Sequence, residues 1–200
     1  MARPAPLDIH PVTLRGRVVQ LEPLSLDHVE GLCEHGLEPA LWQWIPTQAL
    51  TPEDMRAYVV QALAEQERGQ SLPFAIRDLA SGQLAGCTRF GNISAADRRL
   101  EIGWTFVGLP FQRSGVNTEA KTLLLTHAFE TLGAYRVELK TDVLNETSRR
   151  AIARLGATQE GIFRRHVITH SGRARDTVYF AILDHEWPAV KQRLQGLLKQ

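Results

Sequence analysis

The chain has 200 residues, a length typical of one large domain or two small ones. Hydrophobic residues make up 44% and charged residues 22%, a balance that excludes an intrinsically disordered chain. The formal net charge of +1 excludes a protein that attracts nucleic acid or an acidic membrane through its overall field.

The cysteine content and the apolar stretches indicate a cytoplasmic protein. The two cysteines, Cys33 and Cys87, have no metal-ligand spacing, so we expect neither a disulfide framework nor a zinc site. The N-terminus has no apolar core of a signal peptide, and no apolar run is long enough to cross a bilayer.

The first quarter of the chain predicts one strand and two helices. Residues 18–24 alternate and are β-branched, as in a strand, and the serine that follows caps a helix over 25–37. A second helix over 51–69 begins with Thr-Pro-Glu-Asp, a strong start signal. Trp42 and Trp44 lie between the helices in a predicted loop or short turn, where they either pack in the core or line a ligand site.

Three further strands predict an antiparallel meander. Residues 72–77, 84–93 and 100–107 are apolar, and only short turns separate them. Gly103 interrupts the third strand, which indicates a bulge or a close approach of the backbone.

The second half alternates strands with helices and then ends in a hairpin. No linker interrupts the chain, so we expect a loose segment over residues 1–14 and a single α+β domain over 15–200. The predicted elements are a helix over about 116–132, a strand over 135–142, a helix from Asn145 to Gly156, a hairpin of 158–169 with 177–183, and a last helix after Pro188.

The most informative segment is the loop Phe-Gln-Arg-Ser-Gly-Val-Asn at residues 111–117, which follows a strand and opens a helix. Free backbone N–H groups and the positive end of the helix dipole converge in such a loop, and Gly115 lets an anion approach the main chain. Taken alone, this pattern is equally typical of a structural turn between a strand and a helix.

The loop resembles the coenzyme A pyrophosphate motif Q/R-x-x-G-x-G/A of the GNAT acyltransferase superfamily, and the order of elements also matches. Glu-Ile-Gly-Trp at 101–104, Thr-Glu-Ala at 118–120, Asn-Glu-Thr-Ser-Arg-Arg-Ala-Ile at 145–152 and the closing hairpin are similar to its ribosomal-protein N-terminal acetyltransferase-like (Rim-type) branch. The resemblance implies a mixed, mostly antiparallel central sheet flanked by helices, with a splayed pair of strands at the coenzyme site.

The same resemblance implies acetyl-CoA as cosubstrate and an amine as acceptor, with no metal, no nucleic acid and no membrane partner; many relatives form homodimers. The loop amides would hold the pyrophosphate, and the edge of the preceding strand would pair with the pantetheine arm. Asn145 would reach the pantetheine or simply cap its helix. Asn117 stands where Gly or Ala is usual, which alters the geometry of the loop. The implied cofactor-binding residues are Trp104, Thr105, Phe106, Val107, Gln112, Arg113, Ser114, Gly115, Val116, Asn117 and Asn145.

Direct acetyl transfer needs a neutral amine and no covalent enzyme intermediate, so the chemistry calls for a base and an acid. Glu101 is the candidate base, and its alternative is a salt-bridged or solvent-facing carboxylate. Strand alternation places Glu101, Gly103 and Thr105 on one face. Ile152 matches the position of the family's usual acid, a tyrosine, and cannot donate a proton. Ser148 is therefore the candidate acid, with a plain helix-surface serine as the alternative.

Several other polar residues carry open alternatives. His166 and His170 share a strand face without a third metal ligand, and His166 is a candidate acceptor contact or base. Arg149, Arg150 and Arg154 either meet the 3′-phosphate of coenzyme A or form a solvated helix face. The acceptor is a protein N-terminal α-amine or a small-molecule amine, and the competing function is a non-catalytic acyl-CoA-binding protein.

Overall fold

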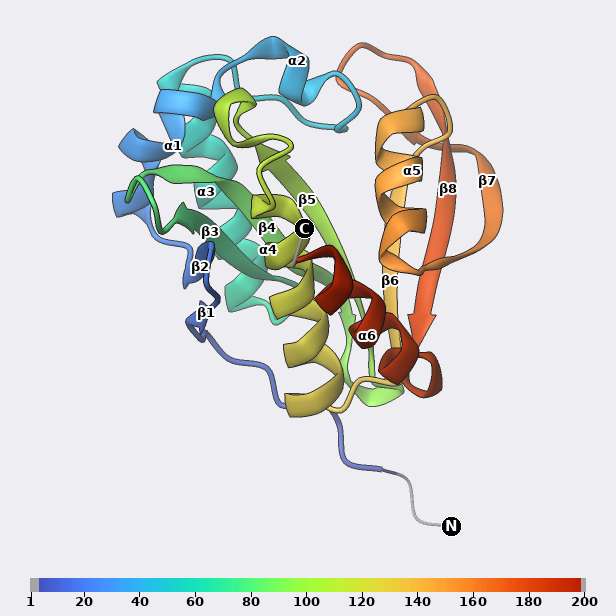
Figure 1. The fold of residues 1–200 in the computed structure, drawn as a ribbon. Helices are drawn as coiled ribbons and strands as arrows, with labels where there is room; N and C mark the ends of the chain where they lie inside the picture. Colours follow the sequence, from blue (N-terminus) through green and yellow to red (C-terminus); the bar gives the residue numbers. More distant parts are fainter. Residues whose placement is uncertain (1–3, 199–200) are drawn as a thin grey trace.

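A single eight-stranded sheet forms the centre of the molecule in the order β1-β2-β3-β4-β5-β6-β8-β7 (Figure 1). The computed structural model describes residues 4–198; residues 1–3 of the expected loose segment and residues 199–200 lie outside it. All neighbouring strands are antiparallel except β5 and β6. The strands are β1 (Leu14–Arg15), β2 (Val19–Pro23), β3 (Leu72–Asp78), β4 (Leu84–Ser94), β5 (Arg99–Val107), β6 (Arg136–Asp142), β7 (Thr158–Ile168) and β8 (Ala174–Leu183).

Helices bury both faces of the first half of the sheet but only one face of the second half (Figure 1). One apolar cluster joins α4, α5 and α6 to one face, and a second cluster joins α1, α2 and α3 to the other. No helix in residues 4–198 is long and apolar enough to span a membrane. The helices are α1 (Val29–Gly36), α2 (Pro39–Trp42), α3 (Pro52–Glu67), α4 (Val116–Thr126, extended by a π-helical turn, His127–Thr131), α5 (Glu146–Leu155) and α6 (Trp187–Leu197).

The predicted mixed, mostly antiparallel architecture is confirmed, and local capping signals explain why the helices were found. The Thr51 hydroxyl accepts a hydrogen bond from the backbone N–H of the third residue of α3, and the Asn145 side chain does the same for α5. Gly156 ends α5 with a φ of 105°. The sequence did not reveal β1 or α2. Residues 4–13 have no regular structure, yet Leu7 is buried in the core.

A bulge in β5 overturns the predicted alternation of that strand. The register with β4 shifts between the Cys87–Phe106 and Arg89–Gly103 pairs, and Trp104 adopts a φ of 48°. Because the bulge adds a residue, Thr105 does not share the face of Glu101, and its hydroxyl contacts Lys121 of α4. Gly103 therefore marks a bulge, as predicted, but the face assignment of Thr105 was wrong.

The sheet forks after the first three residues of β5. β5 pairs with β6 only from Arg99 to Glu101, opposite Arg136 to Glu138. Beyond this point the two strands separate, so the β6-facing edge of the rest of β5 has no strand partner. The predicted splayed pair of strands is confirmed, and the fork lies between α4 and α5 (Figure 1).

Strand β7 forms the edge of the sheet at the far end from β1, and it is long and exposed. Ile162, Phe163 and Ile168 are each about half or more exposed there. The pairing with β8 is interrupted between Phe163 and Val167, and Arg165 within this interruption has a φ of 48°. The strand is therefore a bulged edge rather than a continuous ladder.

A buried carboxylate fastens the start of the sheet to α4. Glu119 accepts hydrogen bonds from the backbone N–H groups of Arg17, Val18 and Val19 at 3.0, 2.6 and 2.7 Å. Gly16 is required beside it, because a Cβ there would lie 2.3 Å from a carboxylate oxygen. Glu119 thereby holds the turn between β1 and β2 against α4, the helix that begins in the predicted anion-binding loop at residues 111–117.

We expect Glu119→Gln to lower the free energy of unfolding by about 2–4 kcal/mol, because an amide leaves at least one buried N–H of the turn without an acceptor. Urea titration measures the change. Glu146→Gln is the matched control: Glu146 is an exposed partner of Arg150, so its loss should cost less than about 0.5 kcal/mol. Equal effects of the two substitutions would contradict the role given to Glu119.

Candidate functional site

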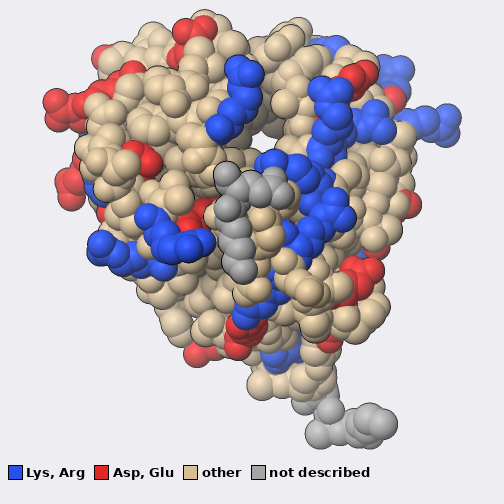
Figure 2. All heavy atoms as spheres, viewed as in Figure 1, with Lys and Arg blue, Asp and Glu red and all other residues tan. Residues whose placement is uncertain are grey.

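A cavity of about 530 Å³ occupies the fork of the sheet. Its walls come from the first turn of α4, the splayed part of β5, the end of β6, the first turns of α5, and the start of β8. Figure 2 shows the surface hollowed between α4 and α5, with Lys and Arg side chains along the rim. Nine of the predicted catalytic and cofactor-binding residues line this cavity; they are Glu101, Trp104, Thr105, Val107, Gln112, Arg113, Asn117, Asn145 and Ser148. Ile152, which stands in place of the family's usual acid, lines it as well.

The predicted anion loop has the backbone geometry of a nest. Arg113 and Gly115 have φ values of 59° and 87°, and the first backbone hydrogen bond of α4 runs from the Glu119 N–H to the Gly115 carbonyl. The N–H groups of the first α4 turn therefore have no intrahelical acceptor. A Cβ at Gly115 would meet nothing within 4 Å, so the space beside the loop is open. Asn117, the second residue of α4, is exposed and lines the cavity.

Gln112, Ser114 and Val116 make contacts that hold the loop in shape, and Gln112 also lines the cavity. The Gln112 side-chain amide donates to the Val107 carbonyl at 2.9 Å, and the Ser114 hydroxyl donates to the Phe111 carbonyl. The Val116 side chain is buried in the core. These contacts fix the path of the loop between β5 and α4, so any contribution from Ser114 and Val116 to ligand binding comes from their backbone amides.

The splayed part of β5 offers the cavity both side chains and main chain. The Trp104 carbonyl accepts a hydrogen bond from the Tyr58 hydroxyl at 3.1 Å, and the Val107 carbonyl is taken by Gln112. The Phe106 ring is buried among residues of the α3 face. Only part of this stretch is therefore available for a ligand that adds to the strand edge.

Glu101 is buried at the point where the sheet forks. Its carboxylate lies 2.7 Å from Lys140 Nζ and accepts a hydrogen bond from Asn92 Nδ2 at 2.5 Å. Burial lowers the pKa of Lys140, but the charge of Glu101 and its hydrogen bond more than offset this, so the pKa is raised overall. Glu101 is therefore salt-bridged, as the alternative to a catalytic base predicted, but its carboxylate still lines the cavity.

The α5 residues lie where the sequence placed them. The Asn145 side chain accepts a hydrogen bond from the Ser148 N–H at 3.0 Å, so its capping role is met. Ser148 and Ile152 both line the cavity, one turn apart, and Ile152 is also part of the core. Of the three arginines on this helix, Arg154 alone lines the cavity, where its guanidinium donates to Thr118.

Lys121 is a buried cation of the cavity that no local sequence pattern indicates. Its ammonium donates to the Thr105 hydroxyl at 2.6 Å, lies 3.4 Å from the Thr88 hydroxyl, and lines the cavity. Burial lowers the pKa of Lys121 to about 7, and the nearby charge of Glu101 opposes this shift. In the sequence Lys121 lies among the residues of an ordinary helix, so only the packing of α4 on β4 and β5 reveals it.

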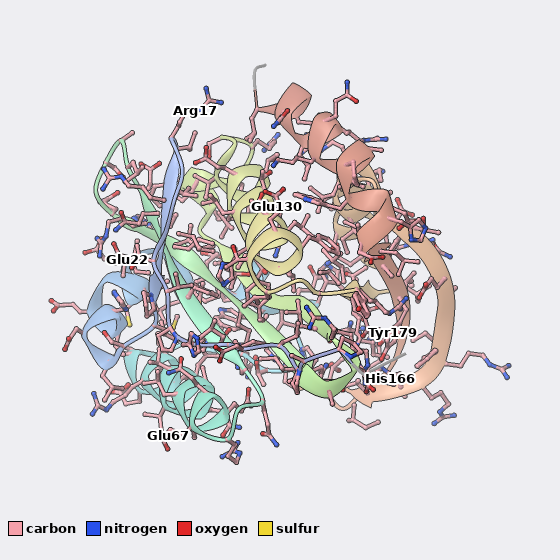
Figure 3. All side chains as sticks on the ribbon, turned by 90° about the horizontal axis from the view of Figure 1, so that it is seen from below. Arg17, Glu22, Glu67, Glu130, His166 and Tyr179 are labelled. Carbon is pink, nitrogen blue, oxygen red and sulfur yellow. The ribbon has the colours of Figure 1, made fainter. Side chains whose placement is uncertain are left out.

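Aromatic and histidine candidates divide between the core and the cavity. Trp42 is buried in the core, whereas Trp44 lines the cavity. His166 lies beside Tyr179, with 3.3 Å between its Nε2 and the phenol oxygen, and also lines the cavity (Figure 3). Burial and the positive charges of Lys140 and Arg175 lower the pKa of His166. Within residues 4–198, no group of three His, Cys, Asp or Glu side chains could hold a metal.

Known proteins are similar to the chain over most of its length. The family model described as an acetyltransferase (GNAT) domain matches residues 19–158. A Bacillus subtilis protein provisionally named ribosomal N-acetyltransferase YdaF is 34% identical over 113 residues, which are 56% of this chain and 61% of that protein. The chain thus spans less than two thirds of this relative.

Solved structures are similar over nearly the whole chain. A GCN5-related N-acetyltransferase from Brucella melitensis superposes with a TM-score of 0.90 at 34% identity, covering 97% of this chain and 89% of that one. RimJ from Mycobacterium smegmatis, solved in complex with CoA-disulfide, superposes with a TM-score of 0.81 at 26% identity, covering 94% and 95%.

The lowered pKa of Lys121 predicts a pH-dependent stability. Between about pH 7 and 10.5 the unfolded chain binds a proton at Lys121 that the folded chain lacks, so raising the pH favours folding. We expect Lys121→Met to be more stable than the unaltered protein at pH 6.5, with a gap that narrows toward pH 9.5 in urea titrations. Lys191→Met on α6 is the control, since it removes no fully buried charge. A gap that widens with pH would refute the prediction.

Proposed function

Because the chain belongs to the GNAT acetyltransferase family, we propose that it moves an acetyl group from acetyl-CoA directly to a primary amine. The observation that carries this proposal is the cavity in the fork, which joins the free amides of the α4 loop to the carboxylate of Glu101. GNAT acetyltransferases use acetyl-CoA, and the RimJ structure contains a CoA species.

The residues of the cavity fit this cosubstrate. The backbone amides of residues 113–117 form an anion-binding nest suited to the pyrophosphate. The β6-facing edge of β5 over residues 104–107 has no strand partner, and the part of it not already bonded to Tyr58 and Gln112 suits the amide groups of the pantetheine arm. Asn145 lines the same cavity. Arg154 is the helix α5 arginine available to the 3′-phosphate, while Arg150 pairs with Glu146 at the surface.

Bound acetyl-CoA supplies the activated acetyl thioester. The chain itself must hold the amine neutral and position it. Glu101 accepts the proton of the amine, directly or through water, and Lys140 holds the carboxylate in place. The acetyl C–S bond breaks as the new C–N bond forms, and Ser148 or Lys121, which both line the cavity, donates a proton to the departing thiolate; Ile152 cannot serve.

The acceptor we propose is an α-amine, and a protein N-terminus is one such group. An α-amino group with a pKa near 8 is roughly 10% neutral at pH 7, whereas a lysine side chain is below roughly 0.1% neutral. Because more of an α-amine is already neutral, its acetylation needs less proton removal by Glu101, whose carboxylate is ion-paired with Lys140. The name of the Bacillus subtilis relative supports a ribosomal acceptor for that protein, and by analogy here.

A non-catalytic acyl-CoA-binding protein remains the alternative, favoured by Ile152 and Asn117. Incubation with acetyl-CoA and a panel of peptides and small amines, read as release of free thiol, separates the two functions. Release above background with any amine supports the enzyme. Tight binding of CoA without release across the panel supports the binding protein.

Gly115→Glu should weaken CoA binding by about 100-fold or more, because the new carboxylate projects into the open space of the nest and repels the pyrophosphate. Titration calorimetry with CoA measures the loss. Gly115→Ala, which shares the backbone strain at a φ of 87° but adds no charge, is the control and should lose much less. Undiminished binding by Gly115→Glu would show that the pyrophosphate lies elsewhere.

Glu101→Gln should slow acetylation of amines with a pKa near 10 by about 100-fold, and that of α-amines by less than about tenfold. Steady-state kinetics at pH 7 with matched amines test this split. Glu138→Gln is the control, because Glu138 also contacts Lys140, at 3.6 Å, but does not line the cavity. An equal loss for all amines would assign Glu101 a structural role.

A further inference from the structure

Arg175 is a buried cation in the cavity that has no carboxylate partner. Arg175 is 7% exposed and lines the cavity from β8. The neighbouring cations are compensated: Lys140 pairs with Glu101, and Arg173 pairs with Asp142. Among residues 4–198, no Asp or Glu oxygen lies within 4.0 Å of Arg175, which leaves this positive charge unneutralised.

Two hydrogen-bond donors on this wall of the cavity also lack partners. Arg175 Nε and Thr177 Oγ1 are both buried and make no hydrogen bond within the described part of the chain. Arg175 Nη1 donates to the Trp44 carbonyl at 3.3 Å, which leaves the edge of the guanidinium that carries Nε free. Buried polar atoms are nearly always paired, so two free donors in one cavity indicate a missing acceptor group.

These donors lie on the side of the fork opposite the α4 loop. Residues 175 and 177 lie on the same face of β8, opposite Val178 and Phe180, which pack in the core under α4 and α5. The α4 loop and the Arg175 wall therefore lie on opposite faces of the sheet, and the cavity passes between them. Glu101 and Trp44 line the cavity together with Arg175.

The charges around Arg175 favour an anion at this place. Burial lowers the pKa of Arg175, and Asp142 and Glu101 oppose this shift, while Arg173 adds to it. A guanidinium stays protonated even so, and a carboxylate that pairs side-on with it would neutralise the charge and satisfy Nε. His166 and Tyr179 also face this region.

We propose that Arg175 and Thr177 bind a carboxylate carried by the acceptor amine. This inference rests on the proposed acetyl transfer and narrows its substrates to amines with a nearby carboxylate. The carboxylate comes either from a free α-amino acid or from the side chain of an acidic residue at a peptide N-terminus. Neutral amines of the same size lose this contact and leave the buried guanidinium unpaired.

Matched acceptors test the proposal. L-Alanine is compared with L-alaninamide, and an amidated peptide beginning Asp-Ala is compared with one beginning Ala-Ala. We compare kcat/KM per concentration of neutral amine, because the carboxylate and amide acceptors differ in amine pKa. We expect the value for the carboxylate member of at least one pair to exceed that of its neutral partner by about tenfold or more. The first pair identifies a free amino acid as the source, and the second an acidic N-terminus. No preference in either pair overturns the inference while leaving the proposed acetyl transfer intact.

Substitutions at Arg175 and Thr177 test whether these two residues cause the preference for a carboxylate-bearing acceptor. Arg175→Gln and Thr177→Val should raise KM for the preferred carboxylate acceptor and remove the difference in kcat/KM between it and its neutral partner. Arg68→Gln, an exposed arginine just after α3, is the matched control and should change nothing. A preference that survives Arg175→Gln overturns the inference, and melting temperatures verify that each variant is folded.

A second readout does not need turnover. In ¹H–¹⁵N spectra of the CoA-bound protein, the Arg175 Nε–H signal is assigned by its absence in Arg175→Gln. Addition of L-alanine or the Asp-Ala peptide should shift it, whereas L-alaninamide and the Ala-Ala peptide should not. An unmoved signal overturns the inference. Should no amine release thiol, the proposed function fails, and this titration still decides whether the wall binds a carboxylate.

Discussion

Strand β5 separates from β6 after Glu101 while staying paired with β4, and the candidate site follows from this fork in the sheet. Three paired residues join the two halves, after which β5 and β6 separate and leave main-chain groups of β5 without a strand partner. Unpaired backbone inside a protein needs another partner, and an extended ligand with amide groups provides one. The Gly103 bulge turns Thr105 toward α4, so the same distortion that accompanies the fork also brings Lys121 to the cavity.

Buried charge is the second theme of the site. Glu101 and Lys140 neutralise each other where the strands part, whereas Lys121 and Arg175 have no carboxylate at ion-pair distance among the described residues. Burying an isolated charge costs free energy, and enzymes commonly keep such charges in cavities where they bind ligands or take part in catalysis. The two cations lie on opposite faces of the sheet, Lys121 on α4 and Arg175 on β8. They therefore act on different ligand groups within one continuous cavity.

Much of the fold could be read from local signals, and the site only in part. The Thr51 and Asn145 caps and the Gly156 stop depend on neighbouring residues, so sequence alone locates them. Gly103 indicated a bulge but not its effect, because one inserted residue reverses the face of every residue that follows. The pairing of Glu101 with Lys140 and the exposure of Arg175 to the cavity depend on strands distant in sequence. No local pattern encodes such contacts.

The interrupted edge at β7 has a consequence for behaviour at high concentration. An uninterrupted outer strand with half-exposed Ile162 and Phe163 would be a template on which further copies add, strand by strand, into aggregates. The break after Phe163 carries Arg164, Arg165 and His166, and Arg165 is turned into a left-handed conformation with its N–H donated to Asp176. This charged irregularity interrupts the exposed ladder, so the edge resists amyloid-like growth while keeping its apolar side chains.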